Sequence, residues 1–167
     1  EVFDEASDVV VYDVERHEIV TADLLSSKDA FETFPTFSPD GRSLYFCSSV
    51  AALPMPERFR EIKFSLCRID FNPEDCSFGT QVDTLFNART EGRSVSFPRI
   101  SPDGKYLVFA LGDYGNFTIW HKEADLYCID MSNGAISPMT ALNSDDAESY
   151  HSWSSNSRWL TFGTRRD

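Results

Sequence analysis

Short runs of apolar, aromatic and β-branched residues alternate along this chain with clusters of Ser, Pro, Asp, Asn and Gly. No window of about 12 residues keeps an apolar period of 3.6 without an interrupting Pro, Gly or β-branched run. Apolar runs bounded by turn residues are typical of β-strands. The pattern therefore predicts an all-β protein of short antiparallel strands with almost no helix.

One unit recurs: an apolar strand, a tight turn and a second apolar strand. Pro pre-sets φ in the turn, Gly supplies a positive φ and Asp bonds its own turn backbone, so Ser-Pro-Asp-Gly predicts a hairpin loop. In the third copy Ser155, Asn156 and Ser157 replace Pro-Asp-Gly, which leaves the tightness of that turn open. The copies span residues 34–46, 97–109 and 150–162, and the intact turns are Ser38, Pro39, Asp40 and Gly41, and Ser101, Pro102, Asp103 and Gly104.

Proline also indicates where the first strand of each unit lies in its sheet. Pro35 and Pro98 have no N–H to donate to a strand ladder, so they are expected in edge strands. In a propeller blade, that edge strand lines the central channel. The repeat therefore predicts which strand lies innermost.

A second repeat supplies two further strands for each unit. A strand ending in Asp occurs at residues 8–13, 65–70 and 125–130, and a turn follows it each time. Asn133-Gly134, between two β-like runs, is the strongest local hairpin signal. The outermost strands are expected around residues 18–23, 81–86 and 135–140.

The two repeats together predict four-stranded antiparallel blades. Equivalent positions lie 53–63 residues apart, whereas a bare four-stranded blade takes about 40–50 residues. The excess is expected in the loops at residues 50–62 and 112–123, each joining the second strand of its blade to the third. The chain is then a single propeller domain or fragment, residues 1–167, with a half blade at 8–24, blades at 33–87 and 95–141, and a half blade at 149–164.

This combination of motifs resembles the TolB-type, WD40-like propeller repeat of bacterial envelope proteins. The motif F-P-x-x-S-P-D-G-x-x-L-x-F, followed by D-L-Y-x-x-D, covers nearly the whole chain. The chain is most similar to uncharacterised Bacteroidetes envelope proteins, some of them labelled cytochrome c biosynthesis proteins. The resemblance implies a periplasmic or envelope location, with any export signal already removed.

Half a blade, two blades and another half blade make about three blades, and known propellers have about four to eight. Each half blade alone would also present an unpaired strand edge, which folded proteins generally avoid. We therefore expect a homodimer in which two chains complete a six-bladed ring, burying Val9, Val11, Trp159 and Phe162. The rival interpretation is a fragment of a longer propeller.

The formal net charge is −12, which argues against nucleic acid or an anionic membrane as partner, since both need a basic surface. No run of about 18 apolar residues is present, so no membrane insertion is expected. The densest acidic cluster, at residues 145–148, is expected in an exposed loop between blades.

Four cysteines are too few and too irregularly spaced for a small disulfide scaffold. Cys67 and Cys76 flank a turn and could form a bridge, although free thiols are favoured. The other two are Cys47 and Cys128, and no Cys-x-x-Cys motif occurs.

No hydrolase elbow, phosphate loop, zinc pattern or calcium loop is present. No catalytic residue, metal site or cofactor is therefore expected. His17 lies in a turn and is expected at the surface. The more interesting candidates for a ligand site near the propeller mouth are Trp120 with His121, and Tyr150 with His151. These side chains could equally be core and loop-packing residues.

Arginines are the remaining candidates in this acidic chain. Arg99 lies on an innermost strand, where alternation could direct it into the channel to hold a carboxylate. It could equally pair with Asp40 or Asp103. Arg93, Arg165 and Arg166 are weaker candidates of the same kind.

The sequence thus favours a non-catalytic binding or scaffold module for a protein or small ligand in the bacterial envelope. An alternative is a substrate-gating propeller whose catalytic part lies outside this chain. Such an enzyme would be prolyl-oligopeptidase-like or related to cytochrome c biogenesis. A third interpretation is an enzyme that uses His121 and His151 as acid and base or as metal ligands.

Overall fold

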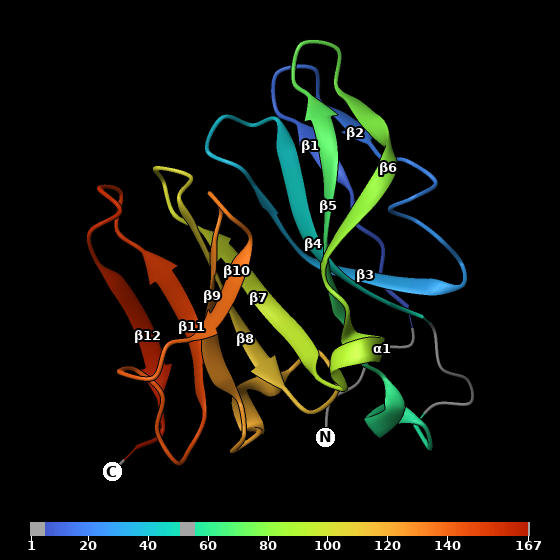
Figure 1. Ribbon diagram of the computed structural model, residues 1–167. Helices are drawn as coiled ribbons and strands as arrows, with labels where there is room; N and C mark the ends of the chain where they lie inside the picture. The colour runs from blue at the N-terminus through green and yellow to red at the C-terminus, as the bar shows by residue number, and fades with distance from the viewer. Residues whose placement is uncertain (1–5, 51–55, 167) are drawn as a thin grey trace.

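The computed structural model describes residues 6–50 and 56–166, which form an all-β arrangement of antiparallel sheets (Figure 1). Two sheets have four strands in the order of the sequence, and two have two strands. The strands of the first half are β1 (Val11–Asp13), β2 (Glu18–Val20), β3 (Ala30–Phe37), β4 (Ser43–Val50), β5 (Ser65–Asn72) and β6 (Ser77–Phe86). Those of the second half are β7 (Ser94–Ile100), β8 (Tyr106–Gly112), β9 (Asp125–Asp130), β10 (Ala135–Pro138), β11 (Glu148–Trp153) and β12 (Leu160–Thr164).

The two four-stranded sheets, β3–β6 and β7–β10, run over residues 30–86 and 94–138. The hairpins β1–β2 and β11–β12 precede and follow them in the sequence. As the prolines indicate, β3 and β7 are edge strands. The outer strands differ from expectation in length, because β6 begins at Ser77 and both β2 and β10 end early.

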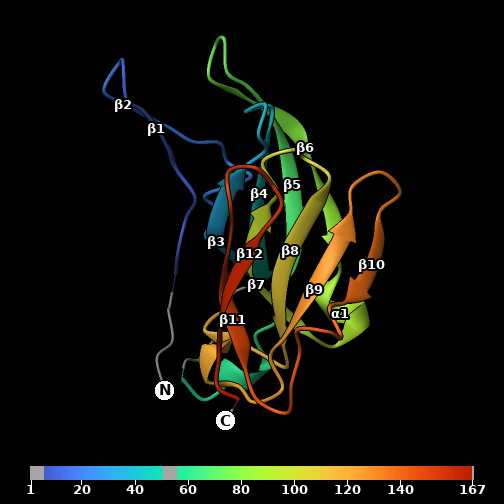
Figure 2. The same ribbon diagram turned by 90° about the vertical axis from the view of Figure 1, so that its left-hand side faces the viewer.

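The sheets lie face to face in sequence order, and one apolar cluster fills each gap (Figures 1 and 2). Val9 and Leu25 pack against Leu44 and Phe46 between the first hairpin and β3–β6. Leu160 and Phe162 of β12 pack against the opposite face of β7–β10. The two hairpins therefore lie at opposite ends of the stack.

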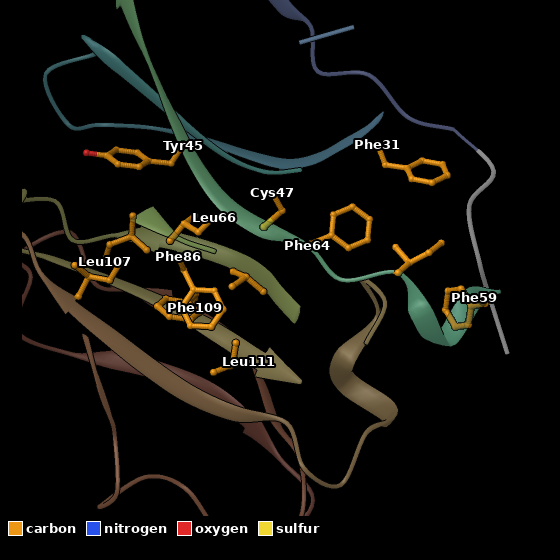
Figure 3. Packing of buried hydrophobic residues seen from close by; sticks show 13 residues of the cluster. Phe31, Tyr45, Cys47, Phe59, Phe64, Leu66, Phe86, Leu107, Phe109 and Leu111 are labelled. Atoms are coloured by element: carbon orange, nitrogen blue, oxygen red, sulfur yellow. The ribbon is translucent and has the colours of Figure 1, made fainter. Parts of the chain in front are cut away.

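The largest cluster lies between β3–β6 and β7–β10 (Figure 3). Cys47 and Leu66 face Leu107 and Phe109 across this gap, and all four are 0% exposed. Burying a large apolar side chain stabilises a fold by roughly 1.5–3 kcal/mol. This cluster therefore fixes the two complete sheets relative to each other.

The Ser-Pro-Asp-Gly turns are held by the hydroxyl of their first residue. Ser101 Oγ donates to Asp103 Oδ1 over 2.7 Å and accepts from the Tyr106 amide over 3.0 Å. In the altered third turn, Ser154 Oγ donates to Asn156 Oδ1 over 2.8 Å and accepts from the Trp159 amide over 2.9 Å. Each distance differs by only 0.1 Å from its counterpart in the Ser101 turn. The third turn is thus as tight as the others, since Asn supplies the same acceptor oxygen as Asp.

The strands β3, β7 and β11 each have a bulge at the same position of the repeat. The ladder shifts register beside Phe34 in β3, Phe97 in β7 and Tyr150 in β11. These residues have φ values of 52°, 52° and 51°, in the left-handed region that L-residues rarely adopt. A bulge bends its strand and redirects a side chain, and here three aromatic rings are redirected in the same way.

The two long loops join β4 to β5 and β8 to β9, as expected. Each contains a short 3-10 helix, η1 (Phe59–Glu61) or η2 (Thr118–Trp120). Residues 51–55 of the first loop lie outside the described residues. A four-residue helix, α1 (Ala88–Glu91), connects β6 to β7.

The prediction that residues 145–148 form an exposed acidic loop is wrong for Glu148. This residue begins β11 and is 0% exposed. Its carboxylate accepts hydrogen bonds from Ser144 and Thr164 and pairs with Arg166 over 3.1 Å. Buried charge is tolerated when it is paired and hydrogen-bonded, and these partners come from outside the acidic run.

No helix among the described residues is long and apolar enough to cross a membrane. All four cysteines are free thiols, and Cys47 and Cys67 are buried. Burial raises the pKa of the Cys67 thiol to about 11. His17 is exposed in the β1–β2 turn, as predicted, with its Nδ1 2.8 Å from the Tyr12 hydroxyl.

Candidate functional site

The candidate ligand residues come from two elements that lie against each other, η2 and β11. Trp120 ends η2 and His121 follows it, whereas Tyr150 and His151 lie in the middle of β11. Within each pair the two side chains have opposite surroundings. The aromatic rings are exposed, Trp120 by 71% and Tyr150 by 64%, whereas His151 is 3% exposed.

His151 is part of the packing between β11 and β8. Its Nε2 lies 2.9 Å from the carbonyl oxygen of Val108, and its Nδ1 has no hydrogen-bond partner among the described residues. Burial, together with the charge of Arg99, lowers the pKa of His151 to about 4. The imidazole is therefore neutral near pH 7 and closed to solvent.

His121 holds the second long loop against β8. Its ring packs against Tyr114 in a tilted arrangement with centroids 4.4 Å apart. Its Nδ1 lies 3.2 Å from Glu123 Oε1, without hydrogen-bond geometry. The loop approaches so closely that a Cβ on Gly112 would lie 2.8 Å from Thr118 Cγ2. His121 and His151 thus pack different parts of the molecule, and no described contact joins them.

Arg99 lies between the second sheet and the last hairpin. Its carbonyl oxygen accepts a hydrogen bond of 3.1 Å from Trp153 Nε1, and its Nη1 donates to the Pro98 carbonyl over 3.2 Å. The acids suggested as partners are engaged elsewhere. Asp40 accepts from Ser38, and Asp103 accepts from Ser101 and pairs with Lys105.

The other candidate arginines have structural contacts. Arg93 donates to the carbonyl oxygens of Leu111, Gly112 and Glu123, and so ties the second long loop to its sheet. Arg165 pairs with Asp146 over 3.8 Å. Arg166 pairs with Glu148 and also donates to the Leu142 carbonyl.

The sequence did not reveal a row of aromatic rings that runs across β3, β7 and β11. Phe34 packs against Phe97 in a tilted arrangement with centroids 4.3 Å apart, and Phe97 packs against Tyr150 in the same way at 5.2 Å. Phe117, from the second long loop, contacts Phe34 edge-on at 6.5 Å. The available signal was the aromatic residue that opens all three copies of the first repeat.

Two grooves also accompany the sheets. One, of about 410 Å³, lies between the two Ser-Pro-Asp-Gly turns and is lined by Tyr45, Arg68, Ile100 and Met131. The other, of about 600 Å³, has Lys63 and Arg89 in its lining. Lys63 Nζ donates to the carbonyl oxygens of Gly92 and Asp113, so its ammonium group holds together segments that connect the sheets.

No group of three or more His, Cys, Asp or Glu in residues 6–50 and 56–166 is arranged to hold a metal ion.

No protein-family model and no curated protein matches this chain. Among solved structures it is similar to a chain from a structural and mechanistic analysis of two prolyl endopeptidases. The TM-score is 0.51 at 18% identity, and the match covers 80% of this chain and 18% of that one. At this identity the likeness concerns the fold, and it supports a propeller-like module.

Proposed function

We propose that this chain is a non-catalytic binding and scaffold module of the propeller type, in which each four-stranded sheet is one blade. The TolB-type resemblance, the face-to-face stack of sheets and the propeller-like neighbour support the blade interpretation. The same resemblance supports a place in the periplasm or cell envelope. Propellers present loops on a rigid support, and function resides in those loops and edges.

The observation that carries the proposal is the position of Trp120 and Tyr150. Both rings are largely exposed, yet both are backed by buried residues, Thr118 beside Trp120 and His151 beside Tyr150. Large exposed aromatic side chains held by a rigid support are common anchors for a protein or ligand. The buried histidines then position this surface rather than contact the ligand.

Capture from an envelope extract by cross-linking tests this surface. A partner retained by the wild-type chain should be lost from the Trp120→Ala and Tyr150→Ala variants. Tyr106→Ala is the matched control, because Tyr106 is 43% exposed but begins β8, a different element from η2 and β11. Equal retention by all three variants would contradict a role for this surface.

The non-catalytic part of the proposal has its own test. Peptide turnover by the purified chain that disappears in His121→Ala or His151→Ala would contradict it. Turnover unaffected by either change would point to a contaminating enzyme.

A substrate-gating module is the second candidate, and the prolyl endopeptidase similarity favours it. Because the match covers only 18% of that enzyme chain, the enzyme's activity is not carried over to this chain. Sequencing the encoding gene on both sides of this segment separates the candidates. An adjoining hydrolase domain would favour gating, and its absence would favour the scaffold.

A further inference from the structure

The groove between the two Ser-Pro-Asp-Gly turns is separate from the surface formed by Trp120 and Tyr150. Its volume of about 410 Å³ is in the range of small-ligand pockets. Residues of both four-stranded sheets line it, and all of them lie within residues 38–131. The walls of the groove are therefore two adjacent, complete sheets.

Tyr45 is the buried polar side chain in the wall of this groove. It is 4% exposed, and Figure 3 shows its hydroxyl directed away from the apolar side chains of the cluster. No other described residue forms a hydrogen bond with this hydroxyl, although a buried tyrosine usually has such a partner. Burial raises the pKa of Tyr45, so the protonated hydroxyl can both donate to a ligand and accept from it.

Asp40 adds a negative charge to the same groove. Its Oδ1 accepts hydrogen bonds from the Ser38 hydroxyl over 2.5 Å and from the Arg42 amide over 3.0 Å, and these bonds hold the pKa of Asp40 below its usual value. Its Oδ2 can still accept a bond from a ligand. No described lysine or arginine forms an ion pair with Asp40, whereas Asp103 on the opposite turn pairs with Lys105 over 3.3 Å.

The turn itself does not require the charge of Asp40. In the third turn, Asn156 occupies the equivalent position and accepts the same hydroxyl bond over 2.8 Å. The turn therefore needs an acceptor oxygen but not a carboxylate. Asn156 is not part of this groove, so the negative charge is present where it faces the groove.

The rest of the lining is mostly apolar. Arg68 is the cation in this lining, and its guanidinium donates to the Ser43 hydroxyl and to the carboxylates of Asp70 and Asp83. Because two carboxylates balance its charge, Arg68 offers no free positive charge to an anion. The apolar side chains come from both sheets and their turns: Pro39, Leu85, Ile100, Pro102 and Met131.

We propose that this groove binds a basic side chain, lysine or arginine, of a protein partner. The aliphatic stem packs against the apolar lining, and the ammonium or guanidinium group donates to Asp40 Oδ2 and to the Tyr45 hydroxyl. An apolar stem with a cationic end matches an apolar groove that has one unpaired carboxylate. The net charge of −12 also attracts a basic partner. This site goes beyond the proposed surface at Trp120 and Tyr150 and does not rest on it.

Titration with Nα-acetyl-lysine N-methylamide and with its arginine analogue, followed in two-dimensional amide NMR spectra, tests the proposal. The amide resonance of Gly104, which lines the groove, should shift in a saturable manner with at least one of them, and less at high salt. Gly134 has almost the same φ in a turn outside the groove, 73° against 72°, and its resonance should not shift. Nα-acetyl-norleucine N-methylamide has the stem of lysine without the ammonium group and should cause no saturable shift.

Two substitutions remove the polar contacts and leave the fold intact. Asp40→Asn keeps the acceptor oxygen of the turn, as Asn156 shows, and should weaken binding of the basic probes about tenfold or more. Tyr45→Phe removes a hydroxyl that bonds to no other described residue, and should weaken binding about threefold. Asp75→Asn is the matched control, because Asp75 accepts a similar bond of 2.6 Å from the Ser77 hydroxyl in a turn outside the groove.

Saturable binding of a basic probe that Asp40→Asn and Tyr45→Phe weaken and Asp75→Asn leaves unchanged would support the site. No saturable shift of Gly104 with either basic probe, an equal shift of Gly134, or an equal response to the norleucine probe would overturn it. Unchanged affinity in Asp40→Asn or in Tyr45→Phe would also overturn it. Trp120 and Tyr150 take no part in this titration, so their surface and the groove can fail independently.

Discussion

Two buried glutamates occupy equivalent positions in the repeat but have opposite environments. Glu32 in β3 and Glu148 in β11 each lie two residues before the aromatic residue of the bulge, and they are 2% and 0% exposed. Glu148 has Arg166 and two hydroxyl partners. Glu32 Oε2 has no hydrogen-bond partner among the described residues. The same buried position can therefore stabilise or destabilise the fold.

Replacing Glu32 should stabilise the protein at alkaline pH. Burial, together with the nearby Asp8, raises the pKa of Glu32 from 4.5 to about 7. Glu32 therefore lowers the free energy of unfolding progressively as pH rises from about 4.5 to 7, and the full loss remains above pH 7. Glu32→Gln should gain about 1–3 kcal/mol at pH 8 relative to wild type and little at pH 5. Urea unfolding at the two pH values measures this, and a pH-independent difference would contradict it.

Replacing Glu148 should have the opposite effect. Burial favours a raised pKa, but hydrogen bonds from Ser144 and Thr164 and the Arg166 charge hold the pKa of Glu148 below its usual value. Glu148 therefore adds to the free energy of unfolding above its unfolded-state pKa. This stabilisation is lost as pH falls through its lower folded-state pKa. Glu148→Gln should cost roughly 1–3 kcal/mol at pH 7 and less at pH 3. Asp145→Asn, at an exposed acid of the same cluster, is the control and should leave unfolding unchanged.

At the scale of elements, the turns depend on one hydroxyl each. Ser101 is 0% exposed and Ser154 only partly buried, although both make the same hydrogen bonds. Removing a buried partner costs more, because the groups left behind lose contact with water. Ser101→Ala should lower the free energy of unfolding by about 1–3 kcal/mol, and Ser154→Ala by less. Chemical denaturation measures the free energy of unfolding of both variants. Equal losses in Ser101→Ala and Ser154→Ala would contradict a role for burial.

The order and type of the strands could be predicted because short local motifs specify them in the repeat. Pro35 and Pro98 identified edge strands, and the turn motifs located the hairpins. The bulges could not be predicted, since Phe34 and Phe97 adopt a positive φ despite the following proline, which disfavours compact conformations in the residue before it. Packing between adjacent sheets overrides that local preference.

The candidate site could be predicted only in part. Sequence proximity paired Trp120 with His121 and Tyr150 with His151, but neighbours in a strand such as Tyr150 and His151 point to opposite faces, and Trp120 ends η2 whereas His121 lies just after it. The exposed faces carry Trp120 and Tyr150, and the opposite faces place His121 and His151 in packing contacts. Glu148 was misjudged for a related reason, because its partners Thr164 and Arg166 are distant in sequence.

At the scale of the whole molecule, exposed apolar side chains gather on the two terminal hairpins. Val10, Tyr12, Val14 and Ile19 belong to the first hairpin or its turn, and Tyr150 and Trp159 to the last. Ile69 and Ile129, the equivalents of Tyr12 inside the stack, are 1% and 3% exposed. Each hairpin is a two-stranded sheet among the described residues, and the homodimer expected from the sequence would couple folding to association.

Thermal unfolding should therefore depend on protein concentration. If two chains close one ring, dilution favours the unfolded monomers by mass action. With the usual unfolding entropy per residue summed over two chains, a tenfold dilution should lower the Tm by about 2 °C. Tyr12→Ala should weaken association, since Tyr12 lies on the open face of β1. Ile136→Ala is the matched control, because Ile136 is 38% exposed but lines a groove within its own chain. Calorimetry over a hundredfold concentration range measures the slope. A wild-type Tm independent of concentration at these concentrations would show that the chain folds without a second copy.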